Sequence, residues 1–208
     1  PPLYTSGTSA RLEDLKDPGR FPVFDARRGG QYTYHGPGQL VGYPILSLDN
    51  ALGASDHVCG VEGLVIDALA ELGLANAGRL EGFAGVWLDV DHPDPAVVPR
   101  KICAIGVRLA RGRTMHGFAL NVTTDMAYLR EHIVPCGIGD KPVTSLADEG
   151  IDVTMRDVAD VIEMSVRDQH VRNVREIFRL QRCRWIVGEE RVQQDAVLVS
   201  LDQPSCVT

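Results

Sequence analysis

The sequence predicts an α+β fold, in which helices pack on a mixed, mostly antiparallel sheet. Three observations support this prediction. An amphipathic helix is indicated early in the chain, three strand candidates follow it without a helix between them, and a second helical pattern comes only afterwards. Runs of strands between helices are typical of α+β folds, whereas α/β folds alternate strand and helix. The length of 208 residues fits one domain with a sizeable core.

The first expected elements are two short apolar strands, at residues 23–26 and 40–46. Between them, residues 28–39 contain four glycines in twelve positions. Glycine allows positive φ and a close approach of the backbone to other atoms. We therefore expect this glycine segment to be a loop whose main chain is shaped around a ligand.

The first helix is predicted over residues 56–74, where apolar side chains recur at helical spacing and Gly73 stands at a usual stopping point. Strands are expected at 85–90, 101–109 and 114–122. Prolines between the first two of these strands predict a loop, because proline cannot donate to a β-ladder.

A further loop is expected at residues 135–139, and a last helix is predicted from 155 to 164, with Thr154 as its N-cap. After residue 164 the periodicity weakens. Residues 165–208 are therefore interpreted as a divergent tail of unknown role, in which 197–199 is a candidate strand.

The composition excludes several classes of protein. The formal net charge of −7 argues against bulk attraction to nucleic acid, and no apolar run reaches the ~18 residues of a membrane span. Five cysteines form an odd number and contain no Cys-x-x-Cys pair, which argues against a disulfide framework and against a zinc site. We interpret them as reduced thiols of a cytoplasmic protein.

Cys136 is a candidate nucleophile. Pro135 before it restricts the backbone, and Gly137 after it leaves the sulfur unobstructed. An ordinary thiol is only a few per cent thiolate at neutral pH, so catalysis needs a positive neighbour. The alternative is that Cys136 is a small hydrophobic side chain in a loop.

Lys101 is the candidate for that neighbour, because it begins an apolar strand and loses solvation there. Such a lysine can stabilise a thiolate and shuttle a proton. The alternative is a lysine at a strand end whose ammonium reaches water.

Two histidines, His35 and His116, both precede glycines and are candidate general bases. They leave open a hydrolase that uses Cys136 with a histidine, and equally a histidine that only holds a loop. No third ligand at a recognisable spacing completes a metal site. No phosphate-binding glycine pattern is present either, so equipment for activation by ATP is missing from the sequence.

Four motifs together identify a family. They are Arg-Gly-Gly-Gln-x-Thr-Tyr-His-Gly-Pro-Gly-Gln at 28–39, Lys-Ile-x-Ala-Ile-Gly at 101–106, His-Gly-Phe-Ala-Leu-Asn at 116–121 and Val-Pro-Cys-Gly at 134–137. From residue 1 to about 164 the chain closely resembles the octanoyltransferases of lipoate synthesis. The resemblance implies a fold similar to that of lipoate-protein ligases and the catalytic domain of biotin-protein ligases.

The resemblance also implies a reaction. An octanoyl group passes from octanoyl-acyl carrier protein to the lysine of a lipoyl domain, on a 2-oxoacid dehydrogenase E2 subunit or the glycine-cleavage H protein. No cofactor is implied. Exchange between thioesters is nearly neutral in free energy and the final amide lies downhill, so ATP is not needed.

Site residues are carried over position by position. Cys136 matches the nucleophile that forms the acyl thioester, and Lys101 matches the residue that lowers the pKa of its thiol. The substrate-lining positions implied are Arg28, Gly29, Gly30, Gln31, Tyr32, Thr33, Tyr34, His35, Ala104, Ile105, Gly106, Gly117, Phe118 and Ala119. We also hypothesise that His35 and backbone amides of the glycine segment bind the thioester carbonyl.

Basic residues near the motifs, including Arg108, Arg111 and Arg113, either form a patch where an acidic carrier protein docks or are solvated strand ends and turns. The catalytic domain is expected over 1–164, without the additional N-terminal strand and helix of the family. The competing interpretations are an ATP-dependent lipoate- or biotin-protein ligase, a hydrolase using cysteine and histidine, and an inactive fragment.

Overall fold

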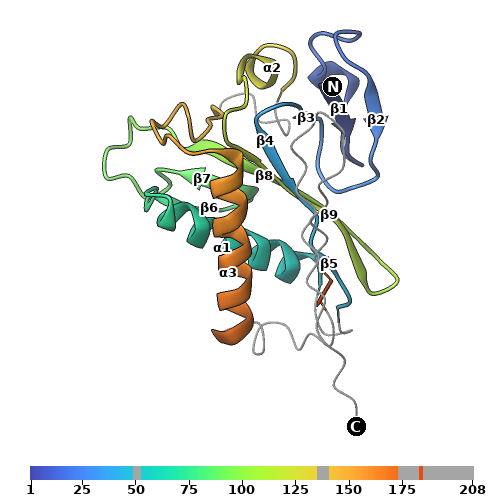
Figure 1. Ribbon diagram of the computed structural model, residues 1–208. Helices are drawn as coiled ribbons and strands as arrows, with labels where there is room; N and C mark the ends of the chain where they lie inside the picture. Colours follow the sequence, from blue (N-terminus) through green and yellow to red (C-terminus); the bar gives the residue numbers. More distant parts are fainter. Residues whose placement is uncertain (49–52, 135–140, 173–182, 185–208) are drawn as a thin grey trace.

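The fold is built on a five-stranded antiparallel sheet, whose strands are labelled in the computed structural model of the protein (Figure 1). The structure describes residues 1–48, 53–134, 141–172 and 183–184. The strand order is β4-β9-β8-β7-β6, with bounds Gln39–Gly42, Arg113–Asn121, Arg100–Ala110, Phe83–Leu88 and Ala77–Leu80. This confirms the α+β prediction.

The three predicted strands correspond to β7, β8 and β9. The hairpin between β8 and β9 turns at Arg111 and Gly112, whose φ values of 53° and 70° are those of a two-residue turn with both central residues left-handed. Because the turn is tight, it determines the pairing from Ala110 opposite Arg113 as far as Cys103 opposite Leu120. The long hairpin extends away from the helices in Figure 1.

Helix α1, Ala54–Glu71, covers one face of this sheet. Its buried stripe includes Val61, Val65 and Leu69, which pack in the main core with side chains of β7 and β8. Gly73, with φ of 96°, follows the last turn, as its position in the sequence predicts. The prediction of this helix is confirmed, apart from a shift of two or three residues at each end.

Helix α3, Met155–Arg172, lies against α1 (Figure 1). Its start is a reciprocal cap. The Asp157 backbone N–H donates to Thr154 Oγ1 at 3.2 Å, and the Thr154 N–H donates to Asp157 Oδ2 at 2.9 Å. Val158 and Ile162 are buried in the main core. The helix runs past the predicted end at 164 because no glycine or proline interrupts residues 165–172.

A second, three-stranded sheet has the order β2-β1-β3, with bounds Val23–Asp25, Leu3–Ser6 and Thr33–His35. Strand β1 pairs in parallel with β2 and antiparallel with β3. The glycine segment is therefore not wholly a loop, since it contains β3. The alternation of buried tyrosines with other residues in this stretch gives it one face that packs in a core, which makes a strand possible there.

The predicted strand at 40–46 is divided by Pro44 into β4 and a short β5, Ile45–Leu46. Strand β5 pairs with β10, Cys183–Arg184, which belongs to the segment interpreted as a tail. The loop at 135–139 and the candidate strand at 197–199 lie outside the described residues.

A smaller core lies under the three-stranded sheet and includes a one-turn helix α2, Ala127–Arg130. The buried residues of this smaller core are Tyr4, Tyr32, Tyr34, Met126, Leu129, Ile133 and Val143. A 3₁₀ turn, η1, spans Leu12–Asp14. Among the described residues, no helix combines the length and the apolar character that a bilayer crossing requires.

Candidate active site

A cavity of about 380 Å³ is lined by residues from both sheets. Of the positions expected to line a substrate, those that border this cavity are Arg28, Gly30, Gln31, Thr33, His35, Ala104, Ile105, Gly106, Gly117, Phe118 and Ala119, and Lys101 borders it too. Gly29, Tyr32 and Tyr34 are not among its lining residues. Cys136 lies outside the described residues. The structure thus brings three separate sequence motifs to one cavity.

The alternation of β3 explains why only some of its residues line the cavity. Successive side chains of a strand point to opposite faces, so Thr33 and His35 border the cavity. Tyr32 and Tyr34 point into the smaller core. The ring of Tyr34 stacks there on Tyr128, with a centroid separation of 5.2 Å. We conclude that these two tyrosines support the cavity wall from behind.

The part of the cavity contributed by β8 and β9 is made largely of small residues. In the hairpin register, Ala104 is opposite Ala119 and Gly106 is opposite Gly117. These two pairs alternate with larger residues along each strand, so they share one face of the sheet. A Cβ atom on Gly117 would overlap the carbonyl of Gly42. Glycine is therefore required at this position by the close approach of another segment of the chain.

Arg28 occupies the end of the cavity near β1. Its guanidinium donates to the Thr5 carbonyl at 3.1 Å and to Thr5 Oγ1 at 2.8 Å, and the side chain is 8% exposed. A Cβ atom on Gly106 would lie 2.8 Å from Arg28 Cδ. The backbone N–H of Gly29 donates to the Val107 carbonyl at 2.9 Å, which attaches the glycine segment to β8. This end of the cavity therefore carries a buried positive charge.

Lys101 borders the cavity from β8 and is only 5% exposed. Its Nζ atom donates to the Ala84 carbonyl at 2.9 Å and lies 4.6 Å from the centre of the Trp87 ring. Gly85 has φ of 123°, and a Cβ atom there would lie 3.3 Å from Lys101 Cε. The expected loss of solvation at Lys101 is confirmed by this burial, and the alternative of an ammonium in water is excluded.

The backbone of Lys101 pairs with the segment that follows the Cys136 loop. Its N–H donates to the Pro142 carbonyl and its carbonyl accepts from the Thr144 N–H, each at 2.9 Å. Pro142 comes six residues after Cys136 in the sequence. The described residues next to the loop are therefore attached directly to the strand that carries Lys101.

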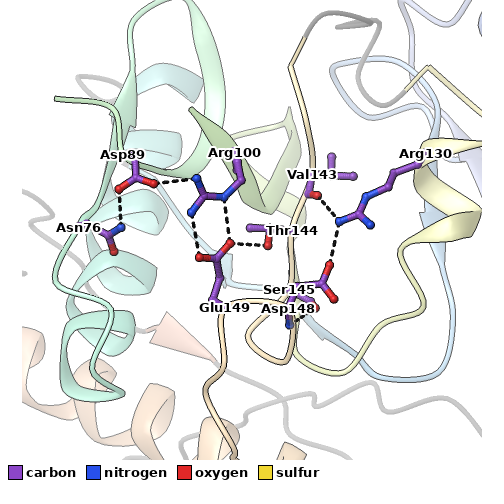
Figure 2. A network of polar contacts seen from close by, with 9 residues as sticks. All are labelled: Asn76, Asp89, Arg100, Arg130, Val143, Thr144, Ser145, Asp148 and Glu149. Carbon is purple, nitrogen blue, oxygen red and sulfur yellow. Dashed lines mark hydrogen bonds and ion pairs between the residues drawn. The ribbon is translucent and has the colours of Figure 1, made fainter. Parts of the chain in front are cut away.

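A network of charged side chains holds this attachment (Figure 2). Arg100 donates to both carboxylate oxygens of Glu149, at 3.0 and 2.8 Å, and lies 2.8 Å from Asp89. Thr144 Oγ1 donates to Glu149 at 2.6 Å. The hydrogen bond from Arg100 lowers the pKa of Glu149, and a hydrogen bond from Asn76 is the main cause of the lowered pKa of Asp89. The network joins the start of β8 to residues 144–149.

The imidazole of His35 has one hydrogen bond among the described residues, with its Nδ1 atom 2.8 Å from Gln39 Oε1. Burial lowers the pKa of His35 to about 4, and the positive charge of Arg28 acts in the same direction. His116, the other candidate histidine, also lines the cavity, and burial lowers its pKa too. Both imidazoles are therefore neutral at neutral pH.

Several lining residues were not expected from the sequence, namely Thr5, Ala26, Tyr43, Gly82, Phe83 and Ala84. Residues 82–84 lie at the start of β7, far from the motifs in sequence. Their position follows from the pairing of β7 with β8. No local signal marks them.

Comparison with known proteins places these observations in context. The family described as "Lipoyl protein ligase A/B catalytic domain" matches residues 1–167. A protein named octanoyltransferase from Salinispora tropica is 51% identical over 164 residues, covering 78% of this chain and 74% of its own length. Another octanoyltransferase, from Jannaschia sp., is 50% identical over 165 residues, covering 76% and 74%.

Solved structures share the fold at lower identity. A bipartite lipoate protein ligase from Thermoplasma acidophilum superposes with a TM-score of 0.62 at 18% identity, covering 82% of this chain and 68% of that one. A lipoate-protein ligase A bound with ATP gives a TM-score of 0.61 at 18% identity, covering 82% and 69%. At this identity the likeness concerns the fold.

Proposed function

The chain belongs to the lipoyl protein ligase A/B catalytic domain family and is an octanoyltransferase, and we propose that it carries the octanoyl group as a thioester on Cys136. The observation that carries this proposal is the buried ammonium of Lys101 at a cavity floored by small residues. A buried cation beside a cavity is the electrostatic setting that a reactive thiolate requires.

The proposed reaction has two steps. In the first, the Cys136 thiolate attacks the carbonyl of the octanoyl thioester, and the carrier thiolate leaves and takes up a proton. In the second, the neutral amine of the acceptor lysine attacks the acyl-Cys136 carbonyl. The amide forms, the Cys136 thiolate leaves, and the amine loses one proton. Lys101 stabilises the thiolate in both steps.

The cavity supports binding of a straight acyl chain. Four small residues of β8 and β9 line it, namely Ala104, Gly106, Gly117 and Ala119. Burial of each methylene contributes about 0.8 kcal/mol, so an eight-carbon chain gains several kcal/mol from a slot of this kind. We propose that the slot selects the chain length by where it ends.

Protein partners follow from the reaction. We propose that octanoyl-acyl carrier protein is the donor and that lipoyl domains of 2-oxoacid dehydrogenase E2 subunits and the glycine-cleavage H protein are the acceptors. Arg108, Arg111 and Arg113 are exposed along the β8–β9 hairpin, whose strand residues floor the cavity. They form a positive surface for an acidic carrier, in a chain whose overall charge is −7.

One experiment tests the acyl-enzyme. The protein is incubated with octanoyl-acyl carrier protein without ATP, and its intact mass is measured. We expect one octanoyl adduct, lost in Cys136→Ser and kept in Cys59→Ser, which removes an exposed thiol as a matched control. Absence of an adduct from the folded parent contradicts the proposal. Release of free octanoate without transfer to a lipoyl domain indicates a hydrolase instead.

A further inference from the structure

We propose that a buried relay of two side-chain amides, Gln39 and Asn121, holds His35 in its Nδ1–H tautomer, so that His35 Nε2 accepts the proton released by the attacking lysine. This inference rests on the proposed function for its chemical step. The tautomer itself is a property of the free protein. His35 would be a catalytic residue of the second step, and Gln39 and Asn121 would be positioning residues.

The direction of the relay is determined by its far end. Asn121 Nδ2 lies 3.0 Å from the Thr144 backbone carbonyl, and a carbonyl oxygen can only accept. The amide nitrogen of Asn121 must therefore face Thr144, which leaves its Oδ1 atom facing Gln39. Gln39 Nε2 donates to that oxygen at 3.0 Å. Gln39 Oε1 then faces His35 Nδ1 at 2.8 Å, and the imidazole must be the donor there.

The relay has little freedom to reverse. Gln39 and Asn121 are cross-strand partners in β4 and β9. Both residues are buried, at 2% and 5% exposure. A flip of Asn121 would place like groups together at both of its contacts, and a flip of Gln39 would place its oxygen against Asn121 Oδ1. A buried, fully paired chain of this kind favours one hydrogen-bond direction.

The anchor of the relay is attached to Lys101. The Thr144 N–H donates to the Lys101 carbonyl at 2.9 Å, and Thr144 Oγ1 belongs to the charged network of Figure 2. These two hydrogen bonds, one from the backbone and one from the side chain of Thr144, hold the orientation of its carbonyl. One continuous set of hydrogen bonds thus connects the strand that presents Lys101 with the imidazole of His35.

The other ring nitrogen of His35 is available to the cavity. His35 lines the cavity, and within the described part of the chain its Nε2 atom neither forms a hydrogen bond nor belongs to the fully buried unpaired atoms. The charged or titratable groups that share the cavity with it are Arg28, Lys101, His116 and Tyr43. Burial keeps the imidazole neutral at neutral pH, with a pKa of about 4. Nε2 therefore has a lone pair.

This changes the expected role of His35. A neutral imidazole has one N–H, and Gln39 takes it, so His35 cannot donate a hydrogen bond to the thioester carbonyl. It can accept one. The acceptor amine carries a surplus proton once its nitrogen has bonded to the acyl carbon, and that proton passes to Nε2 as the Cys136 thiolate leaves. The Nδ1–H bond to Gln39 is kept throughout, and Nε2 later releases its proton to water.

The tautomer is tested directly by long-range ¹H–¹⁵N NMR on the parent labelled with ¹⁵N-histidine. The spectrum contains six histidines, and His35→Gln assigns the His35 signal. We expect a protonated Nδ1 and an unprotonated Nε2 in the free protein at pH 7. A protonated Nε2, or rapid exchange between tautomers, overturns the proposal. Gln39→Met, which removes the acceptor of the Nδ1–H bond, should lose the preference.

The two half-reactions test the chemical role. Acylation of Cys136 is followed by intact mass, and transfer is followed after mixing the acylated protein with a lipoyl domain. We expect His35→Gln and Gln39→Met to slow transfer about 100-fold while the adduct forms within about 3-fold of the parental rate. Transfer at the parental rate in folded His35→Gln overturns the role of His35.

Failure of the proposed function is distinguishable. If the parent forms no adduct on Cys136, the acyl-enzyme is wrong and the base role falls with it, whereas the NMR result still decides the relay. If the adduct forms and His35 has the other tautomer, only this inference is wrong.

Discussion

Lys101 and Trp87 are cross-strand partners in β8 and β7, and the Lys101 ammonium lies 4.6 Å from the centre of the Trp87 ring. The register of the two strands shifts between Val86 and Trp87. The buried ammonium contacts an aromatic face and one backbone carbonyl among the described residues, and no carboxylate. A buried ammonium that no carboxylate of the described residues neutralises can still stabilise a nearby anion.

Lys101→Met should keep the fold and slow the formation of the acyl adduct at least about 100-fold at pH 7. The methionine fills similar space against Trp87 but cannot stabilise a thiolate. Intact mass at timed intervals measures the rate, and circular dichroism checks the fold. A parental rate at neutral pH would mean that Lys101 does not act on the nucleophile.

Gly85→Ala should destabilise the protein and disturb Lys101. The new Cβ would lie 2.6 Å from the Cys103 carbonyl, at a residue with φ of 123°. We expect the free energy of unfolding in urea to fall by about 3 kcal/mol, from backbone strain and overpacking together. Gly82→Ala is the matched control. Its φ is 78° with nothing within 4 Å, so strain alone should cost about 1 kcal/mol. Equal losses in the two variants would contradict this account.

Glu149→Gln should lower the free energy of unfolding by about 2 kcal/mol at pH 7, because Glu149 accepts hydrogen bonds from Arg100 and Thr144. The control is Asp148→Asn. The Asp148 ion pair with Arg130 is roughly half exposed, so that change should cost about 0.5 kcal/mol.

The effect of Glu149→Gln should also depend on pH. The folded protein holds the pKa of Glu149 below its ordinary value of 4.5. The stabilisation is therefore fully present above pH 4.5 and is lost as the pH falls through the lower folded value. Urea unfolding of both proteins between pH 7 and pH 3 measures this. A difference that grows towards acid pH would contradict the assigned charge state.

Reversing Arg111 and Arg113 to Glu should raise the apparent KM for octanoyl-acyl carrier protein about 10-fold, with kcat nearly unchanged, because both side chains are exposed on the β8–β9 hairpin. The increase should shrink at high salt, which screens exposed charges. The same double change to Gln should give a smaller increase. An unchanged KM in steady-state kinetics would exclude the hairpin as the docking surface.

Elements with a clear period were predictable. Helix α1 and strands β7, β8 and β9 were expected within a few residues of their bounds, because their apolar residues recur at the spacing of one buried face. Strands β1, β3 and β6 and helix α2 were missed. Each is only three or four residues long, too short for a period to show, and each forms where a neighbouring element offers hydrogen bonds or a core.

The candidate site was predictable by residue type more than by geometry. The motifs indicated Lys101, His35 and the small residues of β8 and β9, all of which line the cavity. Tyr32 and Tyr34 belong to the same motif as His35, yet they lie in the smaller core. Sequence spacing alone does not say which face of a strand is turned to a ligand.

The sequence by itself determined which chemical groups the protein has and where its backbone needs glycine. A lysine at the start of an apolar strand loses its hydration wherever that strand is buried, as Lys101 does. That Gly85 lies beside Lys101 follows from the pairing of β7 with β8, which the sequence spacing does not show. Only the tertiary structure decided which groups meet. Gln39 and Asn121 are 82 residues apart, and His35 receives its tautomer from the Thr144 carbonyl only because β4 and β9 pair in one register. Secondary-structure preferences depend on a few neighbouring residues, whereas these hydrogen bonds join residues that are distant in the sequence and close only in the folded protein.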